Sequence, residues 1–288
     1  MKIVIIGPNG QLGSTFIEQF TSMYDKTEFQ IQPVPHSALD ITKPAKVKEF
    51  FKFEQPEIVI NCAGYTNVDL AESESGKCYK VNANGVENLL NATHTFGSLF
   101  ITFSSDYVFD GTYTTPYTES SYTNPLSIYG KSKRMADRLV RGYNNYYNIR
   151  TSGLFVRGHQ NFVTGILDQA ANGKVIRVVQ DQFAHLTYIP HLVNAIISLI
   201  RNRPRYGSYN LVNSGVDSWF EYAKRIVQMG GYDVEVHPVL ASEFGGAARR
   251  PPRTELSISK FQTSTNDRMP TWVQGLDDFF YIDKCNLA

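Results

Sequence analysis

The stretch "KIVIIGPNGQLG", residues 2–13, decides how the rest of this 288-residue chain is interpreted. Four apolar residues after Lys2 predict a buried strand, and Gly7, Gly10 and Gly13 follow at intervals of three. Residues 11–23 then read as a helix. A glycine turn between a strand and a helix lets an anion approach the free N–H groups at the helix N-terminus. The pattern predicts a turn that binds a dinucleotide pyrophosphate; the alternative is a tight turn in a flavodoxin-like sheet that binds nothing there.

The first half of the chain continues to alternate short apolar runs with helical patterns. Strands are expected at "FQIQPVP" (29–35), "EIVINCAG" (57–64) and "LFITFSS" (99–105), with helices over residues 44–53 and 76–97 between them. This alternation is typical of an α/β fold, a Rossmann-like doubly wound parallel sheet with helices on both faces. We expect a nucleotide-binding core of residues 1–154 and 186–213. A smaller, interleaved C-terminal substrate lobe would comprise residues 155–185 and 214–288, with a strand within "YDVEVHPV" and a helix at "WFEYAKRIVQMG".

The composition excludes several classes of function. A formal net charge of +1 gives no long-range field to attract nucleic acid or an anionic membrane. Three scattered cysteines and six separated histidines fit neither a disulfide framework nor a metal site. The apolar runs are too short for a signal peptide or a membrane span, so we expect a cytoplasmic protein.

A second group of residues lies further along the chain. Ser105 ends the strand at "LFITFSS", and "IYGKSK" places Tyr129 and Lys133 four residues apart. Asn124 and Pro125 predict a helix start, with Asn124 as the cap and the helix running over residues 126–141. Tyr129 and Lys133 would then share one helix face. Because carboxyl ends of parallel strands line the ligand crevice, all three side chains are expected at the cofactor.

This grouping suits the reduction of a ketone by a nicotinamide cofactor. Hydride arrives at carbon while charge grows on oxygen, so a proton donor is needed. Free tyrosine has a pKa of about 10, and a neighbouring ammonium would lower it towards working pH. Ser105 would hold the carbonyl oxygen as its charge develops. The alternative is that Tyr129 only packs and Lys133 is only solvated.

The second strand bears on the choice of cofactor. Dinucleotide folds usually carry an acidic residue at its end, which binds the adenosine 2′-hydroxyl. Here that stretch reads "PVPHSALDIT" (33–42). It has no Asp or Glu before Asp40, and it contains His36. The sequence therefore favours NADPH, with NADH possible.

Several motifs resemble those of the dTDP-4-dehydrorhamnose reductase family of extended short-chain dehydrogenases. They are "GPNGQLG", "LDIT", "INCAGYTNVDLAE", "VNANGVENL", "SSDYVFDG", "PLSIYGKSK", "DQF" and "RPPRTELSISKF", in the family's order over nearly the whole chain. The resemblance implies reduction of a nucleotide-linked 4-keto-6-deoxy sugar by NAD(P)H, with Ser105, Tyr129 and Lys133 catalytic. It implies cofactor contacts from Gly7, Asn9, Gly10, Gln11, Leu12, Gly13, His36, Asp40, Ala63, Gly64, Tyr65 and Lys133. It implies substrate contacts from Ser105, Asp106, Tyr107, Tyr129, Gly153, Arg157, Asn161, Phe162 and Arg253.

The chain departs from the family pattern at three places. His36 stands where an arginine is common, and Gly153 replaces a tryptophan, which would leave room beside the sugar. Some members hold magnesium between subunits through glutamates. This chain has Thr15 and Pro190 near those positions, so no metal is expected. Arg157 and Arg253 are the expected cations for the substrate diphosphate, because a guanidinium fork suits phosphate oxygens; the alternative for both is solubility.

Three other functions share this fold. Dehydratases carry Asp-Glu after the serine or threonine, whereas this chain reads Ser105-Asp106-Tyr107 and lacks that base. An epimerase needs only cofactor, tyrosine and a keto sugar, and it consumes no NADPH. A decayed site would favour a non-catalytic NADP-binding regulatory subunit, but the glycine turn, Ser105, Tyr129 and Lys133 are all present. The sequence leaves a monomer and a homodimer open.

Overall fold

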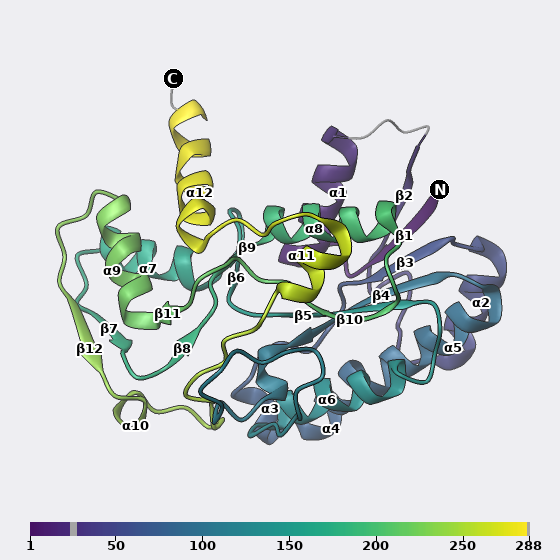
Figure 1. The fold of residues 1–288 in the computed structure, drawn as a ribbon, viewed down its shortest axis with the longest axis horizontal. Helices are drawn as coiled ribbons and strands as arrows, with labels where there is room; N and C mark the ends of the chain where they lie inside the picture. The colour runs from purple at the N-terminus through teal and green to yellow at the C-terminus, as the bar shows by residue number, and fades with distance from the viewer. Residues whose placement is uncertain (24–27, 287–288) are drawn as a thin grey trace.

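The computed structural model describes residues 1–23 and 28–286 (Figure 1). The side chain of Cys285 and residues 287–288 of the predicted lobe lie outside the described residues.

A six-stranded parallel sheet forms the centre, in the order β10-β5-β4-β3-β1-β2. Its strands are β1 (Lys2–Ile6), β2 (Gln30–Val34), β3 (Ile58–Asn61), β4 (Leu99–Ser105), β5 (Tyr146–Thr151) and β10 (Gly207–Asn210). The predicted Rossmann-like doubly wound α/β fold is confirmed. Because β1 lies between β2 and β3, the strand order reverses there, and such a switch point opens a crevice at the strands' carboxyl ends.

Helices cover both faces of the sheet. α1 (Gln11–Met23) and α8 (Ile189–Asn202) lie on one face, and α2 (Pro44–Glu54), α5 (Val86–Phe96) and α6 (Ile128–Val140) lie on the other (Figure 1). In β1, Ile3 and Ile5 belong to the core under the first pair, whereas Val4 and Ile6 belong to the core under the second set. Alternate residues point to opposite faces, so a strand covered on both sides is a continuous apolar run.

The expected helix over residues 76–97 is interrupted. After α3 (Leu70–Ser73), the structure has α4 (Ser75–Tyr79), a π-helical segment η1 (Lys80–Gly85) and then α5. The wider η1 segment carries Asn82, whose amide oxygen accepts from Tyr65 N (2.8 Å). Its amide nitrogen donates to the Tyr65 carbonyl (2.9 Å) and to Ser132 Oγ (3.0 Å). Single π turns of this kind often occur at functional sites.

The helix carrying Tyr129 begins two residues later than predicted. α6 starts at Ile128, and the Ser127 hydroxyl accepts from Gly130 N (3.1 Å), so Ser127 is the cap. The Asn124 amide donates instead to Asp110 Oδ2 (3.0 Å). The predicted cap was wrong because Asn124 has a stronger partner, a carboxylate.

Short elements gather at the end of the molecule away from β2 (Figure 1). We call α7 (Phe162–Ala171), β7 (Ile176–Val179), α9 (Trp219–Met229), β12 (Val236–Val239) and α10 (Ala241–Phe244) the outer region. β12 pairs with β7 in parallel. Two small ladders, β6 (Leu154–Phe155) with β9 (Thr187–Tyr188) and β8 (Phe183–Ala184) with β11 (Asp217–Ser218), lie between this region and the sheet, and α11 (Ser259–Thr265) packs near β10. The division into two lobes remains a prediction.

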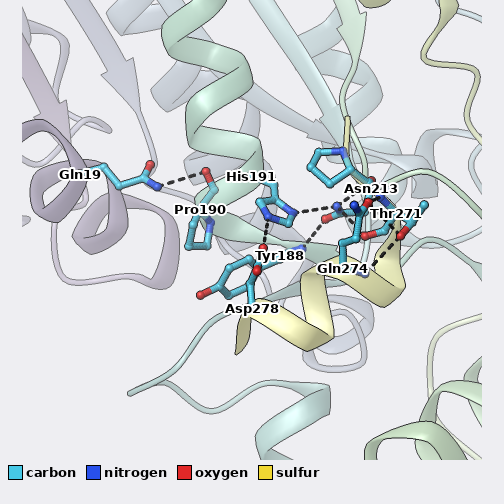
Figure 2. A network of polar contacts seen from close by, with 9 residues as sticks. Gln19, Tyr188, Pro190, His191, Asn213, Thr271, Gln274 and Asp278 are labelled. Carbon is cyan, nitrogen blue, oxygen red and sulfur yellow. Dashed lines mark hydrogen bonds and ion pairs between the residues drawn. The ribbon is translucent and has the colours of Figure 1, made fainter. Parts of the chain in front are cut away.

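A polar joint attaches the C-terminal helix α12 (Trp272–Asn286) to α8 (Figure 2). The buried Asn213 amide nitrogen donates to the Pro270 carbonyl (2.8 Å) and to His191 Nδ1 (2.9 Å), and its oxygen accepts from Tyr188 N (2.8 Å). His191 Nε2 in turn lies 2.7 Å from Asp278 Oδ2. The joint therefore crosslinks segments far apart in sequence.

The positions discussed for magnesium lie near this joint. Thr15 donates its hydroxyl proton to the Gln11 carbonyl (2.8 Å), and the Pro190 carbonyl accepts from Gln19 (3.2 Å; Figure 2). Among the side chains that the structure describes, those of residues 1–22 and 28–281, no three His, Cys, Asp or Glu form a group suited to a metal ion. The same part of the chain contains no helix with the length and hydropathy that crossing a bilayer would require.

Candidate active site

The glycine turn follows β1 directly. Gly7 has φ +75°, and a Cβ there would lie 2.9 Å from Ala63 N. A Cβ at Gly13 would lie 2.3 Å from the Gly7 carbonyl oxygen, so both positions need glycine for close packing. Asn9 and Gly10 are exposed at the start of α1, where free N–H groups favour an anion. The turn thus has the cradle that a dinucleotide pyrophosphate requires.

The other predicted cofactor residues lie in different surroundings. The Leu12 side chain is in the core, so it can offer only its backbone. Gln11 Oε1 accepts from the Asn161 amide (3.2 Å), which links the turn to the segment before α7. His36 is exposed beyond β2, and Asp40 Oδ1 accepts from Thr42 N (2.9 Å). The Thr42 hydrogen bonds are the main reason why the pKa of Asp40 is lowered.

The segment after β3, residues 63–65, lies beside Lys133 and so brings predicted cofactor-binding and catalytic residues together. A Cβ at Gly64 would lie 3.4 Å from Lys133 Nζ, so the ammonium lies against the backbone at Ala63–Tyr65. Lys133 Nζ also donates to the Phe103 carbonyl in β4 (3.0 Å) and lies 5.9 Å from the Tyr129 ring centre. Lys133 therefore connects β3, β4 and α6.

Tyr129, Lys133 and Ser105 meet at the carboxyl end of β4, as predicted. Ser105 is 6% exposed and Lys133 is 7% exposed. The Ser105 side chain interacts with the Tyr129 phenol. The Tyr107 ring lies edge-on to the Tyr129 ring, with centres 5.8 Å apart.

The electrostatics correct the expected effect of Lys133 on Tyr129. Burial raises the pKa of Tyr129, while the interaction with Ser105 acts in the opposite direction. Burial also lowers the pKa of Lys133 to about 8, against the opposing charge of Asp137. Desolvation disfavours the charged form of both groups, and spacing along a helix does not reveal it. Tyr129 is held as a neutral phenol, the form that can donate a proton.

A cleft of about 590 Å³ opens beside this group. Tyr107 lines it from the core side, and the outer region contributes three aromatic rings, Phe162, Trp219 and Phe244. Phe162 and Trp219 lie edge-to-face with ring centres 4.7 Å apart. Two further clefts, of about 620 and 630 Å³, run along α9 and α12 and contain no predicted site residue.

The two arginines predicted for the diphosphate have partners within the protein, and their role at the substrate stays a prediction. Arg157 Nε donates to the Phe279 carbonyl (2.6 Å) in α12, and Arg253 donates to Glu255 (2.6 Å). Neither lines the cleft, whereas Arg249 and Arg250 do. Arg250 binds both oxygens of Asp69, at 3.1 and 2.6 Å, and its charge also acts on Tyr107.

The structure also corrects the expectation of open space at Gly153. Gly153 has φ +55°, and a Cβ there would lie 2.0 Å from the His185 carbonyl oxygen. That direction is filled by backbone, because the Gly153 carbonyl accepts from Thr187 N (2.9 Å). His185 is itself buried: Nδ1 contacts the carbonyls of Asn213 (3.0 Å) and Gly215 (2.9 Å), and Nε2 accepts from Leu256 N (2.8 Å).

The remaining predicted substrate residues divide in two. Tyr107 and Phe162 line the cleft. Asp106 is 3% exposed, and Asn161 caps α7, accepting from Thr164 N (3.1 Å). Sequence reasoning missed Trp219, Phe244, Arg249 and Arg250. The run "ARRPPR" was the one available signal for the arginines.

Comparison with known proteins gives a consistent result. A family model described as "RmlD substrate binding domain" matches residues 1–284. A dTDP-4-dehydrorhamnose reductase of Bacillus anthracis, solved in complex with NADP, is 36% identical, with a TM-score of 0.93 over 97% of this chain and 98% of that chain. A reductase of the same name from Clostridium acetobutylicum is 33% identical, with a TM-score of 0.93 over 99% and 100%.

Among curated proteins, the spore coat polysaccharide biosynthesis protein SpsK of Bacillus subtilis is 34% identical over 89% of each chain. A UDP-glucose 4-epimerase of Thermus thermophilus is 16% identical, with a TM-score of 0.78 over 91% of this chain and 92% of that chain. At that identity the likeness shows a shared fold alone.

Proposed function

Because this chain belongs to the dTDP-4-dehydrorhamnose reductase family, we propose that it reduces the 4-keto group of a nucleotide-linked 6-deoxy sugar, with dTDP-4-dehydrorhamnose as the first substrate to test. The cofactor would be NADPH, which supplies the hydride; NADH is the alternative. The observation that carries the proposal is the meeting of Ser105, Tyr129 and Lys133 beside Gly64 and the glycine turn.

The residues of the chain have separate roles in this proposal. Tyr129 donates a proton to the carbonyl oxygen as charge develops there. Lys133, still largely protonated at neutral pH, lies behind the Tyr129 ring and favours the phenolate that forms. Gly7, Gly13 and the exposed N–H groups at the start of α1 hold the pyrophosphate of the dinucleotide.

The cleft would hold the rest of the substrate. A guanidinium fork suits diphosphate oxygens, so the exposed Arg249 is the first proposed cation, and Arg250, whose fork is bonded to Asp69, would add its charge to the same wall. Phe162, Trp219 and Phe244 offer flat apolar faces for the nucleotide base. Tyr107, the neighbour of Ser105, lines the cleft on the core side. The sugar would therefore lie between Tyr107 and the aromatic rings of the outer region.

The test is a direct assay. The purified chain is mixed with NADPH and dTDP-4-dehydrorhamnose, and the absorbance of the reduced nicotinamide is followed. The proposal expects cofactor oxidation in step with loss of the keto sugar. Conversion of the sugar without net cofactor oxidation would identify an epimerase. Tight NADPH binding without turnover of any nucleotide-linked keto sugar would favour a regulatory binding protein.

A further inference from the structure

Asp106 is a buried carboxylate directly behind the proposed catalytic serine. It opens the short 3₁₀ turn η2 (Asp106–Val108) that follows β4, and it is 3% exposed. Its partners are three hydroxyl groups. Ser105 Oγ donates to Oδ1 (2.9 Å), while Ser152 Oγ (2.8 Å) and Thr254 Oγ1 (2.6 Å) donate to Oδ2. Both oxygens are thus engaged inside the protein, away from the cleft surface.

This arrangement occupies the only proton that Ser105 can give. A serine hydroxyl has one O–H donor and two acceptor lone pairs. Because Ser105 donates its proton in the hydrogen bond to Asp106, its oxygen can only accept. It accepts from Tyr107 N (3.2 Å) and faces the Tyr129 phenol. A negative charge on Tyr129 must then compete with a carboxylate for the Ser105 proton.

The charge of Asp106 acts in the same direction. Its field raises the pKa of Tyr129, in addition to the larger effect of burial. Burial raises the pKa of Asp106 itself, while its hydroxyl partners lower it. The titratable and charged groups that face Asp106 and Tyr129 are Tyr107, Cys78 and Lys133, with Arg250 and Asp69 beside Tyr107.

We propose that Asp106 is a positioning residue that acts through Ser105, holding the serine proton and setting how readily Tyr129 releases its own. A neutral amide of the same shape is a weaker acceptor for the Ser105 proton, which then becomes available to the phenolate, and it removes a repulsive charge. Tyr129 then ionises at lower pH. This role rests on the proposed reduction, and it replaces the sequence-based expectation that Asp106 contacts the substrate.

The first experiment measures Tyr129 without turnover. Tyrosine labelled at the phenol carbon is followed by NMR in the wild type and in Asp106→Asn, with Tyr129→Phe identifying the signal. We expect its titration in Asp106→Asn to move down by about one pH unit or more, as loss of a neighbouring like charge does. Asp110→Asn, the same change in the same loop, should leave the signal unchanged. An identical Tyr129 signal in Asp106→Asn and wild type, at every pH where both stay folded, overturns the proposal.

The second experiment separates positioning from substrate contact. With dTDP-4-dehydrorhamnose and NADPH, Asp106→Asn should keep KM within about twofold and move the alkaline fall of kcat to lower pH. A KM rise of about tenfold with an unchanged pH profile would show a lost substrate contact, and the proposal would fail. If the wild type reduces no keto sugar, the proposed function fails, while the NMR titration still judges Asp106.

A milder pair of variants covers the case in which Asp106→Asn does not fold. Thr254→Val removes one hydroxyl partner of Asp106 and should shift the Tyr129 titration in the same direction by a smaller amount. Thr93→Val is the matched control, because Thr93 is buried to 2% exposure in α5 and its hydroxyl donates within its own helix. Equal titrations in these two variants would contradict the proposal.

Discussion

The two walls of the cleft are held in different ways. On the core side, Tyr107 lines the cleft, and beside it Ser105 at the end of β4 and Lys133 on α6 are both buried. On the outer side, Phe244 is 60% exposed and stands on the four-residue helix α10. The wall that would carry the chemistry is rigid, while the wall that would recognise the nucleotide can change without moving the reacting groups.

The outer wall is anchored at a few points. Residues 240–250 are tied at one end by Ala241 N donating to Asp181 (2.8 Å) and at the other by Ala248 N donating to Asp69 (2.9 Å). Between them, Gly245 and Gly246 have φ +79° and +119°. Such backbone conformations favour glycine at both positions.

The largest expected effect breaks the core wall. Tyr129→Phe should lower kcat by about 10²–10⁴-fold, because the phenol proton is lost while the ring remains. In barrier height this is roughly 3–5 kcal/mol. Steady-state kinetics measures the loss, and NADPH titration should show unchanged cofactor affinity. Retention of more than about a tenth of wild-type kcat would remove Tyr129 as the acid.

The next largest expected effect is a loss of folding stability in acid, caused by the buried His185. Burial lowers the pKa of His185 to about 4 from 6.5, so the folded chain holds it neutral. Below pH 6.5 the unfolded chain binds a proton that the folded chain does not, so stability falls as pH drops towards 4. The shift corresponds to about 3 kcal/mol.

Denaturant unfolding at several pH values tests this expectation. His185→Gln cannot titrate and should lose that part of the pH slope, whereas His36→Gln, at an exposed site, should keep it. A slope that is the same in both variants would mean that His185 is not the group responsible.

The joint in Figure 2 offers a smaller test of how α12 is held. Asn213→Ala leaves the buried N–H of Tyr188 without its acceptor, which should cost about 1–3 kcal/mol of unfolding free energy. Asn202→Ala, at an exposed position of α8, should change it by less than about 0.5 kcal/mol. Thermal and denaturant unfolding measure both. Equal losses would show that the Asn213 hydrogen bonds contribute nothing specific.

The smallest expected effect is on the outer wall alone. Trp219→Ala should raise KM about 2–10-fold, the worth of one aromatic contact, and leave kcat near wild type. Trp219→Phe keeps an aromatic ring against Phe162 and should recover most of the loss. Kinetics with the nucleotide sugar decides, and a fall in kcat instead would mean that the two walls are mechanically coupled.

The core wall could be predicted from sequence because its residues follow strands directly. Continuous apolar runs identify strands covered on both faces, and the parallel order then brings Gly7, Ser105 and Tyr129 to one edge. Burial at that edge is not visible in a spacing, so the direction of the Tyr129 pKa shift was missed.

The outer wall could not be predicted in the same way. Trp219 begins α9, a helix that the sequence predicts, whereas Arg250 lies in a loop, so their meeting at the cleft depends on the path of the loops. Three arginines within "ARRPPR" look alike in sequence, but only the backbone course places Arg250 against Asp69. The cap at Ser127 was missed for a similar reason, because the loop brings Asp110, fourteen residues before Asn124, against the Asn124 amide.

The π-helical turn η1 has a consequence for chain length. Its surplus residue aims Asn82 at both Tyr65 and Ser132. Deleting one residue between Tyr79 and Val86 would make a regular helix, but it would rotate the helix before the deletion by about 100° relative to α5. Related sequences that keep this clamp should therefore tolerate replacements in the segment while conserving its number of residues.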